Sequence, residues 1–259
     1  MVPIVRVLAP NPGIYTLDGT NTWVVGAEPA LVIDPGPEDP NHLQEVARTA
    51  GRVGAVVLTH DHDDHAEGAT RFAELVGAPL FAWRAAGAER LTDGALFHAG
   101  DAEVVAVHTP GHSADHVAFH LPLERTLFTG DAVVGRGTTF LDPPDGDLSA
   151  YLTSLQRMLD LDAATILPGH GPLVSHARAK LLEYLEHRRM REGQVLRALA
   201  DGPATVAELV GSIYAEHPVE VHELAARSVT AHLLKLLADE RVTKHGRGRT
   251  QTWALAAAG

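Results

Sequence analysis

The sequence predicts a mixed α/β domain over residues 1–192, followed by a smaller, mainly helical domain over residues 193–259. In the first part, short apolar segments alternate with segments of helical periodicity, as in folds built from alternating strands and helices. Several of the strand-like segments end in histidine or aspartate. In the second part, three helical segments precede a glycine-containing hairpin pattern.

The first domain opens with short strand-like segments separated by proline, glycine and asparagine turns. Strands are expected over residues 4–8, 22–25, 30–33, 55–58, 79–82, 102–108, 116–120, 126–128 and 165–167. Helices are expected over residues 40–50, 68–76, 148–159 and 177–191. The run at residues 55–58 is apolar throughout, which is typical of a strand buried on both faces.

The second domain has helical segments over residues 193–200, 205–214 and 224–240, and a hairpin pattern over residues 241–255. Three helices followed by a hairpin is the winged-helix pattern. The hairpin is basic, and the residues expected to contact nucleic-acid phosphates are Arg241, Lys244, Arg247 and Arg249. The alternative is a hairpin that packs on the rest of the chain or is only solvated.

Composition limits the chemistry and the partners. The chain of 259 residues has no cysteine, which excludes disulfides and thiolate metal sites and leaves nitrogen and oxygen ligands. Residues 1–192 hold 26 acidic and 14 basic side chains, so this part repels phosphates. No apolar run reaches the roughly 18 residues of a membrane span. The sequence begins at Met1 without a basic and apolar leader, so we expect a cytoplasmic protein without membrane association.

A dense cluster of metal-type ligands, His60, His62, Asp64 and His65, follows the buried strand directly. On a strand, His65 would point away from the other three, so we expect a loop. A loop can direct His60 and His62 to one metal ion, and Asp64 and His65 to a second ion about 3.5–4 Å away.

Three further candidates, His112, Asp131 and His170, each follow a strand-like run and a glycine that lets the backbone turn sharply. Asp131 can bridge two cations because a carboxylate has two oxygens. Residues beside these motifs are candidates to orient the ligands, namely Asp61, Asp63, Asp115 and His116. The histidines in or near strands, His98, His108 and His120, are expected to be core or surface residues.

The ordered set of His60, His62, Asp64, His65, His112, Asp131 and His170 resembles the metallo-β-lactamase superfamily. This resemblance implies a four-layer αββα sandwich. It implies that His60, His62 and His112 hold a first metal ion, and that Asp64, His65 and His170 hold a second. It also implies that Asp131 bridges both ions. Because the bridging residue is an aspartate and not a cysteine, the ligand set is more similar to that of the glyoxalase and nuclease branches than to that of the true β-lactamases.

A narrower resemblance, to the lactamase-beta-like protein 2 group, rests on Asn11-Pro12-Gly13, Gly19-Thr20-Asn21-Thr22, the glycines and threonines of residues 135–139, and the winged-helix-like unit. It implies an endoribonuclease acting on single-stranded RNA, as assigned to the animal member of that group. Two divalent ions, zinc first and iron or manganese otherwise, would activate a bridging water to hydroxide. Asp64 and Asp131 are expected to act in catalysis by accepting its proton.

The alternative function is hydrolysis of a thioester or ester of a small cytoplasmic metabolite, as in the glyoxalase II branch. Hydrolysis of β-lactams fits less well, because the sequence has no export signal. A nucleic-acid-binding module without catalysis would need only a closed, four-coordinate structural metal, and seven ligands exceed that need.

Overall fold

The computed structural model describes residues 2–216, 218 and 221–257. They fall into two compact units. The first comprises Met1–Pro110, Asp115–Thr139 and Ser154–Leu181, and the second comprises Gly111–Ala114, Phe140–Thr153 and Leu182–Gly259. The predicted domain boundary at residue 192 lies within helix α5 (Ala177–Leu199) and stays a prediction.

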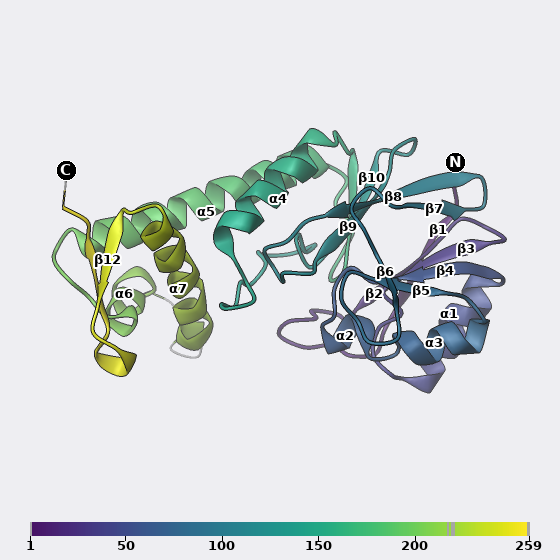
Figure 1. The fold of residues 1–259 in the computed structure, drawn as a ribbon, viewed down its shortest axis with the longest axis horizontal. Coiled ribbons are helices and arrows are strands. Elements are labelled where there is room, and N and C mark those ends of the chain that lie inside the picture. Colours follow the sequence, from purple (N-terminus) through teal and green to yellow (C-terminus); the bar gives the residue numbers. More distant parts are fainter. Residues whose placement is uncertain (1, 217, 219–220, 258–259) are drawn as a thin grey trace. The chain divides into compact units, whose positions relative to one another are not determined.

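The first unit contains two mixed sheets (Figure 1). The six-stranded sheet has the order β1 (Ile4–Leu8), β2 (Asn21–Val25), β3 (Ala30–Ile33), β4 (Val53–Val57), β5 (Leu80–Ala82) and β6 (Glu89–Arg90). The five-stranded sheet has the order β11 (Thr165–Pro168), β10 (Thr126–Gly130), β9 (Val117–Leu121), β8 (Ala102–His108) and β7 (Leu96–Ala99). The predicted α/β class is confirmed. The sequence does not predict β6 or β7, because β6 is two exposed charged residues and β7 is short.

Alternating side chains of the six-stranded sheet form two cores, because successive residues of a strand point to opposite faces. Along β3, Leu31 and Ile33 join a core shared with the five-stranded sheet, whereas Ala30 and Val32 join a core shared with helices. These helices are α1 (Pro40–Ala50) and α3 (Ala69–Val76), which cover the outer face (Figure 1). Strand β4 is therefore apolar on both faces, and it carries the chain to the metal-type ligands.

The ligand cluster itself is only partly a loop. A one-turn helix, α2 (Asp63–Ala66), begins within it and places Asp64 and His65 on consecutive helical positions. The expectation of a loop throughout is therefore wrong for the second half of the cluster. Asp63 and Asp64 occupy the first turn, where the positive end of the helix dipole stabilises carboxylates.

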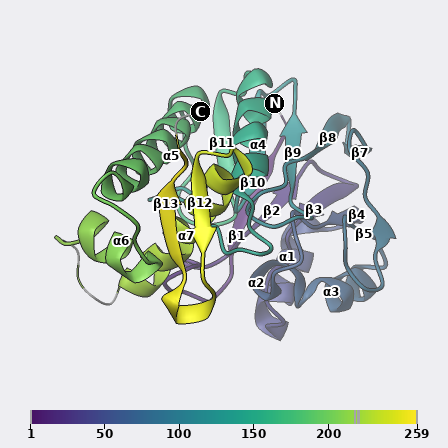
Figure 2. The same ribbon diagram turned by 60° about the vertical axis from the view of Figure 1, so that its left-hand side comes forward.

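The second unit has a winged-helix arrangement. Helices α6 (Val206–Ile213) and α7 (His222–Ala238) precede an antiparallel hairpin of β12 (Val242–His245) and β13 (Thr252–Leu255), with a 3-10 turn at Gly248–Thr250 (Figure 2). Leu209, Val229 and Leu233 pack with Trp253 of the hairpin in one core. A further helix, α4 (Leu148–Asp160), precedes α5 in the chain.

One element differs from the expectation in the second part of the chain. The two helices predicted over residues 177–191 and 193–200 are a single helix, α5, which continues through Gly193. A glycine inside a helix costs only about 1 kcal/mol relative to alanine, and packing of Val195 and Leu199 in the core offsets it. No helix in the described part of the chain has the length and hydropathy that a membrane span requires.

Candidate metal centre

Asp34, a residue that the sequence does not single out, lies at the base of the ligand cluster. It follows β3 and is 1% exposed. Its Oδ1 accepts a hydrogen bond from the Thr59 backbone N at 2.7 Å, and its Oδ2 accepts from Thr59 Oγ1 at 2.7 Å. The same Oδ2 lies 2.8 Å from His65 Nδ1. The carboxylate therefore fixes the ring of His65 so that Nε2 points to the other ligands.

Four potential ligand atoms of the first unit surround a common position, and they belong to Asp64, His65, Asp131 and His170. His65 Nε2 lies 3.2 Å from His170 Nε2, 3.5 Å from Asp64 Oδ2 and 3.4 Å from Asp131 Oδ1. His170 Nε2 lies 3.1 Å from Asp64 Oδ2 and 3.2 Å from Asp131 Oδ1. Ligands at 2.0–2.1 Å around a tetrahedral zinc ion lie about 3.3–3.4 Å apart. The donor set thus has the spacing that one metal ion requires.

Charges within this cluster shift its pKa values strongly. Burial lowers the pKa of His170, but the carboxylates of Asp131 and Asp64 outweigh it and raise that pKa to about 9. Burial likewise opposes a charge on His65, yet Asp34, Asp64 and Asp131 raise its pKa well above the usual value. Burial raises the pKa of Asp131, but His170 and His65 bring it well below its usual value. Without metal, the cluster is therefore held by protonated imidazoles and carboxylates.

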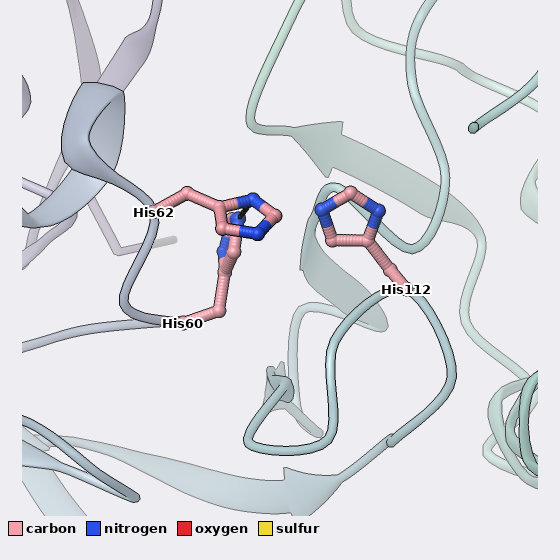
Figure 3. A group of neighbouring side chains, drawn as sticks. All are labelled: His60, His62 and His112. Atoms are coloured by element: carbon pink, nitrogen blue, oxygen red, sulfur yellow. Dashed lines mark hydrogen bonds between the residues drawn. The ribbon is translucent and has the colours of Figure 1, made fainter. Parts of the chain in front are cut away.

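A second group of donors comprises His60, His62 and His112, whose ligand atoms lie within 4.8 Å of one another. The three rings point toward a common space (Figure 3). His60 Nε2 is 3.0 Å from His62 Nδ1. His60 Nδ1 is 3.0 Å from Thr59 Oγ1, and His112 Nδ1 is 3.1 Å from the Phe140 carbonyl oxygen. These contacts at Nδ1 fix the ring orientations of His60 and His112, as expected of histidines that would bind a metal ion through the other ring nitrogen.

The ligand His170 is held by a segment that the sequence singles out without assigning it a role. His170 Nδ1 lies 3.2 Å from the carbonyl oxygen of Gly19. The buried Asn21 donates from Nδ2 to the carbonyl oxygens of Pro168 and Gly171, at 2.9 Å each, and from its backbone N to Gly169 O at 2.7 Å. The turn that carries His170 is therefore fixed on both sides.

Glycine is required before Asp131 and before His170 for two different reasons. Gly130, before Asp131, has a φ of 44°, which confirms the expected sharp turn. Gly169, before His170, is needed for space: a Cβ there would lie 2.7 Å from His65 Cε1 and 2.8 Å from Asp131 Oδ1. A side chain at residue 169 would occupy the metal centre itself.

Comparison with known proteins agrees with this geometry. The sequence profile of the metallo-beta-lactamase superfamily matches residues 15–89 and 80–170. The chain belongs to the metallo-beta-lactamase superfamily. The profile of the beta-lactamase associated winged helix domain matches residues 205–253 of this superfamily member. Family and donor set together make the chain a metal-binding hydrolase.

Individual superfamily relatives cover nearly the whole chain. A beta-lactamase-like protein 2 homolog of Caenorhabditis elegans is 33% identical over 96% of this chain and 89% of its own length. An atrochrysone carboxyl ACP thioesterase of Aspergillus chevalieri is 35% identical over 96% of this chain and 86% of its own length. A metallo-beta-lactamase family protein from Thermus thermophilus has the same fold, with a TM-score of 0.80 and 21% identity over 97% of this chain and 98% of that one.

The residues that the sequence predicts to orient the ligands differ in their burial. Asp61 and Asp63 are exposed, whereas Asp115 and His116 are buried. His116 Nδ1 lies 2.9 Å from Thr109 Oγ1, and its Nε2 accepts from the Ala132 backbone N at 3.3 Å, so both ring nitrogens are used in holding the chain. Among the described residues, none of the potential metal groups includes His98, His108 or His120.

The basic residues of the winged-helix hairpin are not equivalent. Arg241 forms an ion pair with Glu192 at 3.2 Å. Lys244 lies over the ring of Trp253, with Nζ 5.5 Å from its centroid, and Arg247 is exposed. The side chain of Arg249 lies outside the described residues. Contact of these four residues with nucleic acid stays a prediction.

Proposed function

We propose that this chain is a dinuclear, zinc-dependent hydrolase of thioesters. The observation that carries the proposal is the donor set of Asp64, His65, Asp131 and His170, whose atoms already have the spacing of ligands around one ion. The substrate class is supported by a relative named as a thioesterase, which is 35% identical over 96% of the chain.

The residues that would hold the ions are assigned as follows. His60, His62 and His112 would hold the first ion, and Asp64, His65 and His170 the second, with Asp131 between them. Histidine and carboxylate ligands at tetrahedral spacing favour zinc among the first-row metals, although iron and manganese accept the same ligands. When bound, the two ions supply a nucleophile from water at neutral pH and a Lewis acid for the substrate carbonyl.

The chain's own groups handle the proton. Asp64 and Asp131 are partly accessible, with side chains 28% and 15% exposed, whereas those of His65 and His170 are 0% and 1% exposed. We assign these two carboxylates to accept the proton that the attacking water loses. As the C–O bond forms at the carbonyl carbon, the C–S bond breaks, and the leaving thiolate takes up a proton. Asp34, Thr59 and Gly19 keep the imidazole rings oriented throughout.

Cleavage of single-stranded RNA is the second candidate, and one observation favours it: the basic hairpin. Residues 241–251 contain four basic and no acidic side chains. The rest of the chain opposes it, because the net charge is −12 and an acidic surface repels phosphates. We therefore place thioester hydrolysis first.

The test is release of thiol from acyl thioesters of N-acetylcysteamine and of coenzyme A by zinc-loaded protein. The chain has no cysteine, so all thiol that reacts with Ellman's reagent comes from substrate. The variant His60→Ala/His62→Ala is expected to lose at least 100-fold in kcat/KM. The control His98→Ala, which removes an exposed histidine outside both donor groups, is expected to retain full activity.

Two results decide between the candidates. Thiol release that the double variant loses supports the thioesterase. Cleavage of a labelled single-stranded RNA by the wild type but not by the double variant, without any thiol release, would replace it with the ribonuclease.

Metal analysis tests the ion count independently. We expect two zinc ions per chain in the wild type and one in His65→Ala, measured by inductively coupled plasma mass spectrometry after removal of free metal. Two ions in His65→Ala would contradict the assignment of His65 as a ligand.

A further inference from the structure

Four residues lie at the strand ends near the metal ligands, namely Trp83, Thr59, Val117 and His108. They continue inward-facing rows of four strands: Phe81 precedes Trp83 in its row, and Ala106 precedes His108. The rows below are aliphatic or phenyl side chains, whereas these four residues include an indole, a hydroxyl and an imidazole.

These four residues form a closed circuit. Val57 is paired with Phe81 in the parallel strands β4 and β5, so Thr59 and Trp83 each follow two residues later. The backbone N of Val117 donates to Thr59 O at 2.7 Å and joins the two sheets. Val117 is paired with His108 between β8 and β9. His108 closes the circuit by stacking on Trp83, with ring centroids 3.7 Å apart and planes 5° from parallel.

The stack is held in place from behind. The backbone N of His108 donates to Asp93 Oδ1 at 2.8 Å, and its carbonyl oxygen accepts from Arg157 Nη1 at 2.9 Å. Arg157 and Asp93 are themselves joined at 2.9 Å. Both rings are only partly buried. A rigid aromatic surface thus stands beside Thr59, the residue directly before the metal ligand His60.

We propose that the Trp83–His108 stack is the wall on which the acyl group of the substrate lies, so that it selects large apolar acyl groups over small ones. The inference rests on the proposed thioesterase function. Ligand sites combine a few polar groups that fix the reacting atoms with apolar and aromatic walls that bind the rest of the ligand. Here the metal centre would supply the polar groups, and the stack would supply the aromatic wall.

The test compares acetyl, octanoyl and benzoyl thioesters of N-acetylcysteamine. In Trp83→Ala we expect KM to rise about tenfold for benzoyl and octanoyl substrates, because the variant loses both the apolar area and the ring contact of the indole. For the acetyl substrate, KM and kcat are expected to stay within about twofold of wild type. Trp83→Phe keeps a ring and is expected to restore most of the discrimination. Leu96→Ala, an exposed apolar residue on β7, is the control without effect.

Fluorescence tests the wall without turnover. The chain has three tryptophans, and Trp23 and Trp253 are 6% and 1% exposed. A non-hydrolysable ketone analogue of the benzoyl substrate is expected to quench the tryptophan fluorescence of the wild type but not that of Trp83→Phe.

The outcomes separate the two proposals. If the wild type releases no thiol from any substrate, the thioesterase proposal fails, and the quenching experiment still tests the wall. If Trp83→Ala loses activity equally on all three substrates, or if quenching persists in Trp83→Phe, the wall is wrong and the stack only supports the fold.

Discussion

At the scale of single residues, Asp34 controls the orientation of the candidate ligand His65. One buried carboxylate accepts both donors of Thr59 and lies against His65 Nδ1. In Asp34→Asn the charge is lost, and the amide cannot accept from all three donors. We expect the affinity of the second metal ion to fall about 10- to 100-fold. Competition with a chromogenic chelator measures this, and wild-type affinity in a folded variant would refute it.

The pH dependence of stability follows from His170. In the metal-free protein its pKa is about 9, compared with 6.5 for an ordinary histidine. Its contribution to stability is complete below pH 6.5 and is lost as pH rises toward 9. We therefore expect the Tm of chelator-treated protein to fall across this window, and the stabilisation by added zinc to grow, since the ion binds neutral imidazole.

Differential scanning fluorimetry between pH 6.5 and 9, with and without zinc, checks this expectation. The variant His170→Gln serves as the control, because it should remove most of the fall in Tm. A metal-free Tm that rises steadily with pH would show that His170 is not held in its protonated form.

The sequence predicts all seven candidate ligands, because histidines and aspartates at strand ends form an ordered and unusual pattern. Asp34 gives no such signal: one aspartate in a proline- and glycine-rich turn is an ordinary turn residue. Its role depends on contacts with Thr59 and His65, 25 and 31 residues away, which no local spacing encodes. The stack of Trp83 on His108 is hidden for the same reason, since it joins strands of different sheets.

At the scale of elements, the short turns after the strands decide where the ligands lie. Gly169→Ala would place a methyl group 2.7 Å from His65 Cε1 and 2.8 Å from Asp131 Oδ1. Overpacking of this kind costs about 1–3 kcal/mol. We expect the variant to lose the second zinc ion and at least tenfold in activity. Its Tm is expected to fall as well, but the protein should remain folded. Full zinc content by mass spectrometry would contradict this.

Most element positions follow from the sequence, and the exceptions have local causes. Strand β4 and helix α1 are predicted within two residues, because burial on one or both faces leaves a clear pattern. The break predicted near Gly193 is absent, since packing outweighs the weak helical preference of one glycine. The turn α2 is missed because four residues are too few to establish a period.

At the scale of the whole molecule, charge is distributed unevenly. Residues 241–251 carry four of the 21 basic side chains and none of the 33 acidic ones. If this hairpin binds RNA, Lys244→Ala/Arg247→Ala is expected to weaken binding of a labelled single strand about tenfold and to leave thioester hydrolysis unchanged. The control Arg52→Ala/Arg178→Ala removes the same charge from other exposed positions. Equal losses in both variants would mean that only net charge matters.

The distance along the chain between the ligands has a consequence for the order of events during synthesis. His65 and His170 are 105 residues apart, yet their Nε2 atoms lie 3.2 Å from each other. His170 also follows β11, a strand that pairs in parallel with β10 and completes its sheet. A nascent chain that still lacks this segment holds only part of the donor set. Loading of the ion that Asp64, His65 and His170 would hold is thus one of the last steps of maturation, and a ribosome-bound fragment ending before residue 165 should bind at most one zinc ion per chain.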